Sequence, residues 1–180
     1  MRAIMRPAGL SILLIVGLVL ADARGQGAVL PPPAPPAGSQ EVTVMGVFVE
    51  TQTRQPMVVL QGKKDKRSFA MAIGAAEATG IAFPLQNVTP PRPLTHDLFL
   101  TLFTRLNVKV SRVVITDLRD NTYFATLFLT AGGAPIELDS RPSDAIALAI
   151  RANAPVYADD RVFDKATPPP AAPALPGSRI

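Results

Sequence analysis

The chain of 180 residues contains no cysteine, and this absence removes two classes of small domain. Without cysteine it can form neither a disulfide-stapled scaffold nor a zinc site built on thiolates. Histidine is almost as scarce, since His96 is the only one. A tightly held metal ion would therefore depend mainly on carboxylate oxygens, which favours hard ions such as magnesium or calcium.

The signatures of several common enzyme classes are also missing. No cysteine nucleophile exists, and the residues do not define a Ser-His-Asp triad beyond coincidence. Neither common type of glycine-rich phosphate loop is present. Most of the widespread catalytic templates therefore do not fit this chain.

A broad basic surface is a third missing feature, although the net charge is +4. Between residues 41 and 166 there are 14 Lys and Arg against 13 Asp and Glu, so most of the excess lies in the terminal segments. Proteins that bind nucleic acid without sequence preference usually carry a basic surface. One local basic run remains, Lys63, Lys64, Lys66 and Arg67, which is either a solvated hairpin tip or a phosphate-contacting loop.

The first 23 residues are typical of a secretory signal peptide. Arg2 and Arg6 precede the apolar run Leu10–Leu20, and Ala21-Asp22-Ala23 follows it, which predicts cleavage after Ala23. The stretch from Ala8 to Ala21 has 14 residues, fewer than the roughly 20 that span a bilayer. We therefore expect an exported, periplasmic or secreted protein with no stable membrane insertion after cleavage.

Proline marks the borders of the folded domain. Ten of the 19 prolines lie in two Pro- and Ala-rich segments, at 31–36 and 168–176. Such segments are extended linkers or tails. The predicted organisation is a signal peptide at 1–23, a linker at 24–40, a domain at 41–166 and a tail at 167–180.

Hydrophobic patterns within the domain predict an α+β fold with mixed or antiparallel sheets and about three main helices. One helix is expected from residue 74 to 83, ended by Pro84, and a second from Thr95 as its N-cap. The second has Leu98, Leu102 and Leu106 on one face, with Phe99 and Phe103 beside them. The third is expected at 142–153, and strands at 41–49, 57–60, 68–73, 109–116, 122–130, 135–139 and 154–158.

Two segments of the domain resemble each other. A shift of 67 residues aligns Ile73–Phe83 with Ser140–Ile150 and Glu77 with Asp144, each following a hairpin and opening a helix. This pattern predicts a duplicated strand-strand-helix unit. A pseudo-twofold arrangement would bring both carboxylates to one cleft, although each could equally well only offset its own helix dipole.

Several polar residues lie near the predicted ends of elements: Glu77, Arg92, His96, Asp97, Asp117, Asp120, Asp139, Arg141 and Asp144. Carboxylates with one histidine and one or two arginines are the components of metal-assisted phosphodiester hydrolysis. The same residue types also have ordinary structural roles, in which they cap helices and form turns. Asp117, Asp120 and Asn121 are expected to form a turn.

Four segments, IGAAEA, PPRPLTHDLF, RVVITDLRDNTYFATL and ELDSRPSDAIALAIRANAPVYADDRV, closely resemble the bifunctional nuclease domain family. The resemblance covers about residues 42–166, and RPSDAIALAIR is its most specific part. It implies a compact α+β domain and a nuclease that acts on DNA and RNA with a divalent metal ion. The partner implied is nucleic acid. Independently of the resemblance, the apolar edges of the predicted elements could bury against a second copy of the chain and form a homo-oligomer.

The residues and the resemblance together lead to one site hypothesis. Glu77, Asp139 and Asp144 would hold a magnesium ion. The catalytic residues would be His96, which acts as the base, together with Glu77 and Asp144. Three further residues would bind the substrate: Arg141, Arg92 and Ser143. The alternative is a non-enzymatic module of the cell envelope that binds a ligand or partner with the same fold, which the near-neutral domain charge also favours.

Overall fold

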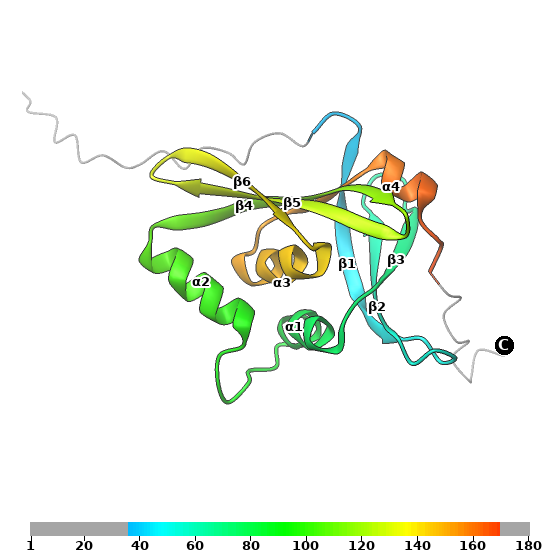
Figure 1. Cartoon of the computed structure of the whole chain (residues 1–180), viewed down its shortest axis with the longest axis horizontal. Helices are drawn as coiled ribbons and strands as arrows, with labels where there is room; N and C mark the ends of the chain where they lie inside the picture. Colours follow the sequence, from blue (N-terminus) through cyan, green and yellow to red (C-terminus); the bar gives the residue numbers. More distant parts are fainter. Residues whose placement is uncertain (1–35, 170–180) are drawn as a thin grey trace, which may run out of the picture. The chain divides into compact units, whose positions relative to one another are not determined.

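The structure is a computed structural model that describes residues 36–169, and within this range the chain forms one mixed sheet with helices packed on it (Figure 1). The predicted signal peptide and most of the linker and tail lie outside the described residues. The elements are β1 (Ser39–Val49), β2 (Pro56–Gly62), β3 (Ser68–Ala72), α1 (Ala75–Leu85), α2 (Thr95–Arg105), β4 (Val108–Arg119), β5 (Thr122–Ala131), β6 (Ala134–Ser140), α3 (Pro142–Ala152), β7 (Val156–Asp159) and α4 (Asp160–Lys165).

The sheet of the described range has seven strands in the order β3-β2-β1-β7-β4-β5-β6. Strands β1 to β3 form one antiparallel meander, and β4 to β6 form another. The short strand β7 joins them, since it runs antiparallel to β1 and parallel to β4. The last strand of the chain therefore closes the centre of the sheet.

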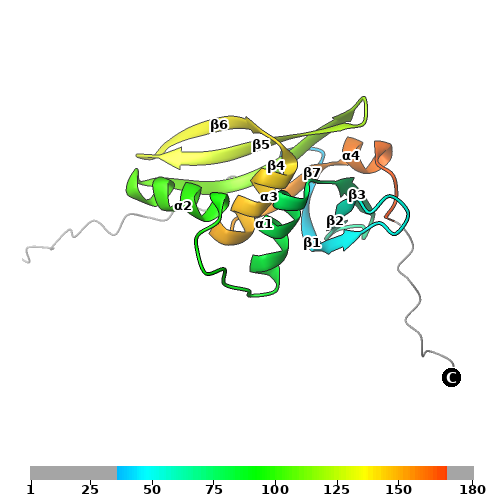
Figure 2. The same cartoon turned by 60° about the horizontal axis from the view of Figure 1, so that its bottom comes forward.

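Each meander leads into a helix, so the predicted order of hairpin and helix occurs twice, ending in α1 and in α3. Figures 1 and 2 show α1, α2 and α3 on the same side of the sheet, with α1 beside α3. The α+β class with three main helices is confirmed.

Helix α3 is the centre of the core. Five consecutive residues from Ala145 to Ala149 are buried, because the helix packs on the sheet and on α1. Alanine side chains allow neighbouring backbones to approach closely, and Ile146 belongs to the same buried cluster as the sheet side chains Ile115 and Leu127. Pro142 lies in the first turn, and Asn153 ends the helix with a left-handed φ of 52°.

The two other main helices differ from their predictions in detail. Helix α1 continues one residue past Pro84, which lies in its last turn and does not end it. Thr95 is the first residue of α2, and Leu94 is its cap. The predicted apolar face of α2 is largely exposed, since Leu98 and Leu106 are 64% and 61% accessible, whereas Leu100 and Phe103 pack against the core.

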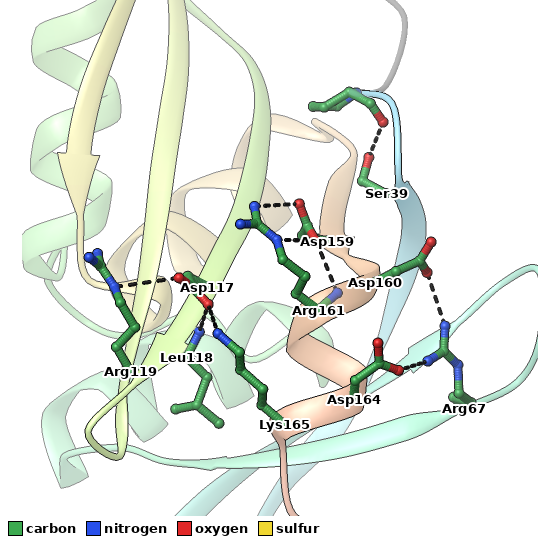
Figure 3. Close-up of polar contacts among 11 residues, drawn as sticks. Ser39, Arg67, Asp117, Leu118, Arg119, Asp159, Asp160, Arg161, Asp164 and Lys165 are labelled. Atoms are coloured by element: carbon green, nitrogen blue, oxygen red, sulfur yellow. Dashed lines mark hydrogen bonds and ion pairs between the residues drawn. The ribbon is translucent and has the colours of Figure 1, made fainter.

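The short helix α4 was not predicted, and ion pairs attach it to the rest of the domain (Figure 3). Arg67, at the start of β3, binds Asp160 and Asp164 at 3.0 and 2.8 Å. The Lys165 Nζ atom lies 2.7 Å from Asp117 Oδ1 in β4. Arg67 in the basic run is thus part of an ion-pair network and is also stacked on Phe163.

The expected turn between β4 and β5 is present, with left-handed φ values of 48° and 59° at Asp120 and Asn121. Asp117 instead lies within β4, where it binds Lys165. Among residues 36–169 no helix has the length and apolar character required to cross a bilayer.

Hydrogen bonds in this network lower the pKa of several carboxyl groups. The Arg161 side chain does so for Asp159, and the Lys165 side chain does so for Asp117. Desolvation raises the pKa of Asp65, but hydrogen bonds from Gln40 and Arg67 outweigh it and bring the value to about 2. These groups are therefore ionised in the folded protein under neutral and mildly acidic conditions.

Acid is expected to weaken the attachment of α4. A carboxyl group with a lowered folded-state pKa stabilises the fold above its unfolded pKa of about 4 and loses that effect as the pH falls through the folded value. Between pH 7 and 5 these carboxyl groups should leave the thermal unfolding midpoint unchanged, and below about pH 4 they should lower it. Calorimetry of the wild type and Lys165→Gln tests this, and an equal acid response in both would contradict a role for the Asp117 pair.

Candidate functional site

A pocket of about 510 Å³ lies where the first turns of α1, α2 and α3 converge. Glu77 and Asp144 are the third residues of α1 and α3, and His96 is the second residue of α2. Free backbone N–H groups and the helix dipole make the start of a helix favourable for negative charge. The fold therefore gathers three helix N-termini, which stabilise carboxylates and would favour a bound anion.

Arg141 joins the two predicted carboxylates of this pocket. Its Nη2 atom donates to Glu77 Oε1 at 2.7 Å and to Asp144 Oδ1 at 3.1 Å. Its Nε atom donates to Asp144 Oδ2 at 2.7 Å. The prediction that Glu77 and Asp144 face one cleft is confirmed.

The electrostatics of Arg141 follow from these contacts. Hydrogen bonds to Asp144, then to Glu77, raise the pKa of the guanidinium above its ordinary value. The side chain is still 67% exposed, and among the described residues its Nη1 atom has no hydrogen-bond partner. Arg141 is thus a fixed cation with one free edge toward solvent.

His96 lies on the other side of Asp144. Its Nε2 atom is 3.4 Å from Asp144 Oδ1, and its side chain is only 12% exposed. The ring packs so closely on Gly80 of α1 that a Cβ atom there would lie 2.8 Å from Nδ1. Glycine at position 80 therefore leaves the space that the imidazole needs, and Asp144 is shared between His96 and Arg141.

A second ion pair, between Arg151 and Asp97, links the helices that form the pocket. The sequence did not predict this role. Arg151 in α3 is 9% exposed, and its Nε atom lies 2.6 Å from Asp97 Oδ1 in α2. Its Nη1 atom also donates to the carbonyl groups of Gly80 and Ala147. Arg151 therefore links α1, α2 and α3 through its contacts with Gly80 and Asp97. Asp97 directly follows His96 in the chain.

Asp97 also stabilises the start of α2, because its Oδ2 atom accepts a hydrogen bond of 2.8 Å from the Leu94 backbone N–H. Burial raises its pKa, but the hydrogen bonds from Arg151 and Leu94 outweigh burial, so the pKa lies below its ordinary value. The sequence contained two signals for these roles. Asp97 lies three residues after Leu94, and Arg151 lies within the motif RPSDAIALAIR.

Three predicted site residues lie elsewhere. Asp139 is exposed on β6 and pairs with Thr126, whereas its neighbour Leu138 pairs with the buried Leu127. Since side chains alternate across a strand, Asp139 projects from the face of the sheet opposite the helices. Ser143 is buried in the first turn of α3 and does not line the pocket, and Arg92 lines a neighbouring pocket.

The residues of the pocket do not fit a divalent metal ion as they are placed. Among residues 36–169 no three His, Asp or Glu side chains are grouped in a way that could hold one. Asp139 is on the wrong face of the sheet, and the guanidinium of Arg141 lies between the two remaining carboxylates. An ion at Glu77 and Asp144 would require Arg141 to leave.

The fold and pocket define an α+β domain with a polar site of histidine, arginine and two carboxylates at converging helix starts. The chain belongs to the bifunctional nuclease domain family, whose sequence profile matches residues 58–170. The profile begins within β2, so β1 lies outside the matched range although the resemblance in sequence included it.

Two kinds of relative are similar to this chain. Uncharacterized protein Rv1829 of Mycobacterium tuberculosis is 38% identical over 126 residues, which are 70% of this chain and 75% of that protein. Bifunctional nuclease 1 of Oryza sativa subsp. japonica is 32% identical over 81 residues, which are 43% of this chain and 24% of the plant protein. The Bifunctional nuclease of Oryza minuta shows the same similarity.

Proposed function

We propose that this protein is an exported nuclease of low sequence specificity that hydrolyses phosphodiester bonds in DNA and RNA. The observation that carries the proposal is the placement of the single histidine beside Asp144, which also binds the exposed Arg141 in one pocket. Membership of the bifunctional nuclease domain family and similarity to plant proteins named bifunctional nucleases support it.

The chain's own residues supply the roles that hydrolysis needs. The free edge of Arg141 would bind a phosphate oxygen and stabilise the charge that develops on it. The Nε2–H group of His96 faces Asp144, so His96 would accept a proton from water at Nδ1 as the water oxygen attacks phosphorus, and Asp144 would stabilise the imidazolium. The bond between phosphorus and the leaving oxygen breaks, and the proton returns to that oxygen through solvent.

Glu77 would act on Arg141 and not on the substrate. It is 16% exposed and binds the Nη2 atom, so it holds the guanidinium plane in place. The magnesium ion expected from the sequence stays a prediction, because the present placement of Arg141 separates the two carboxylates.

The direct test is incubation of the full chain with plasmid DNA and with RNA, each with magnesium and with a chelator. We expect cleavage of both substrates by the wild type and its loss in Arg141→Gln. Absence of cleavage under every condition would overturn the nuclease. Activity that depends on magnesium would support the metal ion predicted from the sequence.

Export is part of the proposal because of the predicted leader at 1–23. N-terminal sequencing of the protein recovered from the cell envelope or the medium tests it. A first residue of Arg24 is expected, and recovery of the intact N-terminus from the cytoplasm would contradict export.

A non-enzymatic ligand- or partner-binding module is the second candidate. The observation that favours it is the pairing of Arg141 with two carboxylates, which offsets its positive charge. A salt titration separates the candidates, because affinity for DNA rises steeply at low ionic strength when phosphates are contacted. Lack of DNA binding even at low salt would favour the module.

A further inference from the structure

A second pocket of about 350 Å³ adjoins the candidate site. It is formed by the end of α1, the loop that leads to α2 and the Asp97–Arg151 pair. Pro93 lines both pockets, so a chain-like ligand could pass from one to the other. The volume is within the range of about 300–1,000 Å³ that is usual for small-molecule sites.

The lining of this pocket combines apolar surface with one available cation. Phe83, Val88 and four prolines, at 84, 90, 91 and 93, supply the apolar part. Arg92 is exposed and has no ion-pair or hydrogen-bond partner among residues 36–169. An aromatic ring and an exposed guanidinium suit a ligand with a flat π-face next to a phosphate, which is the chemistry of a nucleotide.

The walls of the pocket are preformed. Backbone hydrogen bonds of 3.0, 3.3 and 2.9 Å hold Gln86, Asn87 and Val88 to the last turn of α1. Each proline fixes its own φ, which reduces the freedom that binding would otherwise remove. Proline also lacks an N–H group, so the four prolines of this wall donate no backbone hydrogen bonds to the edge of a base.

We propose that this pocket is a base-binding subsite that receives one unpaired nucleobase of the strand whose scissile phosphate lies at Arg141. Phe83 stacks on the base, and Arg92 binds the neighbouring phosphate. The inference rests on the proposed nuclease function and deepens it. The base must leave the helical stack to enter, so the preferred substrate is single-stranded or frayed nucleic acid, and recognition by stacking accounts for low sequence specificity.

The test is fluorescence anisotropy with the full chain and labelled phosphorothioate dT8, which resists hydrolysis. A probe with the same backbone but abasic residues separates base binding from phosphate binding. Phe83→Leu should weaken binding of dT8 about fivefold or more and leave binding of the abasic probe unchanged. Arg92→Gln should weaken binding of both probes and reduce the slope of log Kd against log salt by about one.

Arg105→Gln is the matched control, because Arg105 is exposed at the end of α2 and lines neither pocket. It should bind both probes as the wild type does. Equal binding by wild type, Phe83→Leu and Arg92→Gln would overturn the subsite even if the protein hydrolyses nucleic acid. Base-dependent binding that Phe83→Leu removes would support the subsite even if hydrolysis failed, so the two proposals fail separately.

Discussion

Substitution of Asp144 by asparagine is expected to lower kcat for phosphodiester cleavage by about 100-fold or more, with KM little changed. Asparagine keeps the size of the side chain but removes the charge that would stabilise imidazolium at His96, whose Nε2 atom is 3.4 Å away. Arg141 keeps its 2.7 Å contact with Glu77 and so stays available for phosphate. The loss should therefore fall on the chemical step.

Steady-state cleavage of a fluorogenic oligonucleotide measures the effect. His96→Gln should cost a similar amount, and the double variant little more than either single one, because residues that act as a unit are not additive. Glu137→Gln is the matched control, since Glu137 is an exposed carboxylate on β6 outside the pocket. Full activity in Asp144→Asn would refute the proposed site.

The largest effect on stability is expected from Arg151→Met, which should lower the free energy of unfolding by about 2–3 kcal/mol. Methionine fills much of the space but leaves Asp97 without its charged partner and the carbonyl groups of Gly80 and Ala147 without their donor. Three helices lose their common attachment, so the cost is greater than for a surface ion pair.

Denaturation in urea measures this change, with Arg105→Met as the control. That variant removes an exposed arginine from α2 and should stay within about 0.5 kcal/mol of the wild type. The difference in free energy of unfolding between the wild type and Arg151→Met should also become smaller in acid. The pKa of Asp97 is lowered in the fold, so its contribution is present at neutral pH and is lost as the pH falls through that lowered value. A stability unchanged from the wild type would refute the role of Arg151.

The repeated order of hairpin and helix was predictable because each unit is local in the chain. Periodicity defined the strands and helices, and the shift of 67 residues singled out Glu77 and Asp144 as equivalent positions. Both residues lie in the first turns of helices that converge at one pocket. Equivalent positions in two similar units met because α1 and α3 pack side by side.

The prediction for Asp139 shows where spacing is insufficient. Asp139 and Asp144 are close in sequence, but one lies on a strand and the other on a helix. The register of β6 against β5 places Asp139 on the face of the sheet away from the helices. Which alternate residues of a strand face the core depends on how the strand pairs with a distant segment. No local sequence pattern reveals that pairing.

The two other residues predicted to contact the substrate, Ser143 and Arg92, do not line the candidate pocket, for similar reasons. Burial of α3 on several sides encloses Ser143, and the proline-rich loop carries Arg92 to the adjoining pocket. The exposed Leu98 of α2 and Leu106, which caps the end of α2, also show that an apolar stripe does not identify which side of a helix meets the core. Packing partners decided each of these outcomes.

The sequence by itself determined the family, the order of the strands and of the three main helices, and the residue types available for chemistry, because motifs, periodicity and composition are properties of the chain alone. Only the tertiary structure decided that Arg141 lies between two carboxylates, that His96 fits against Gly80, and that β7 closes the centre of the sheet. These contacts join residues far apart in the chain, and their geometry is set by packing and strand register in three dimensions.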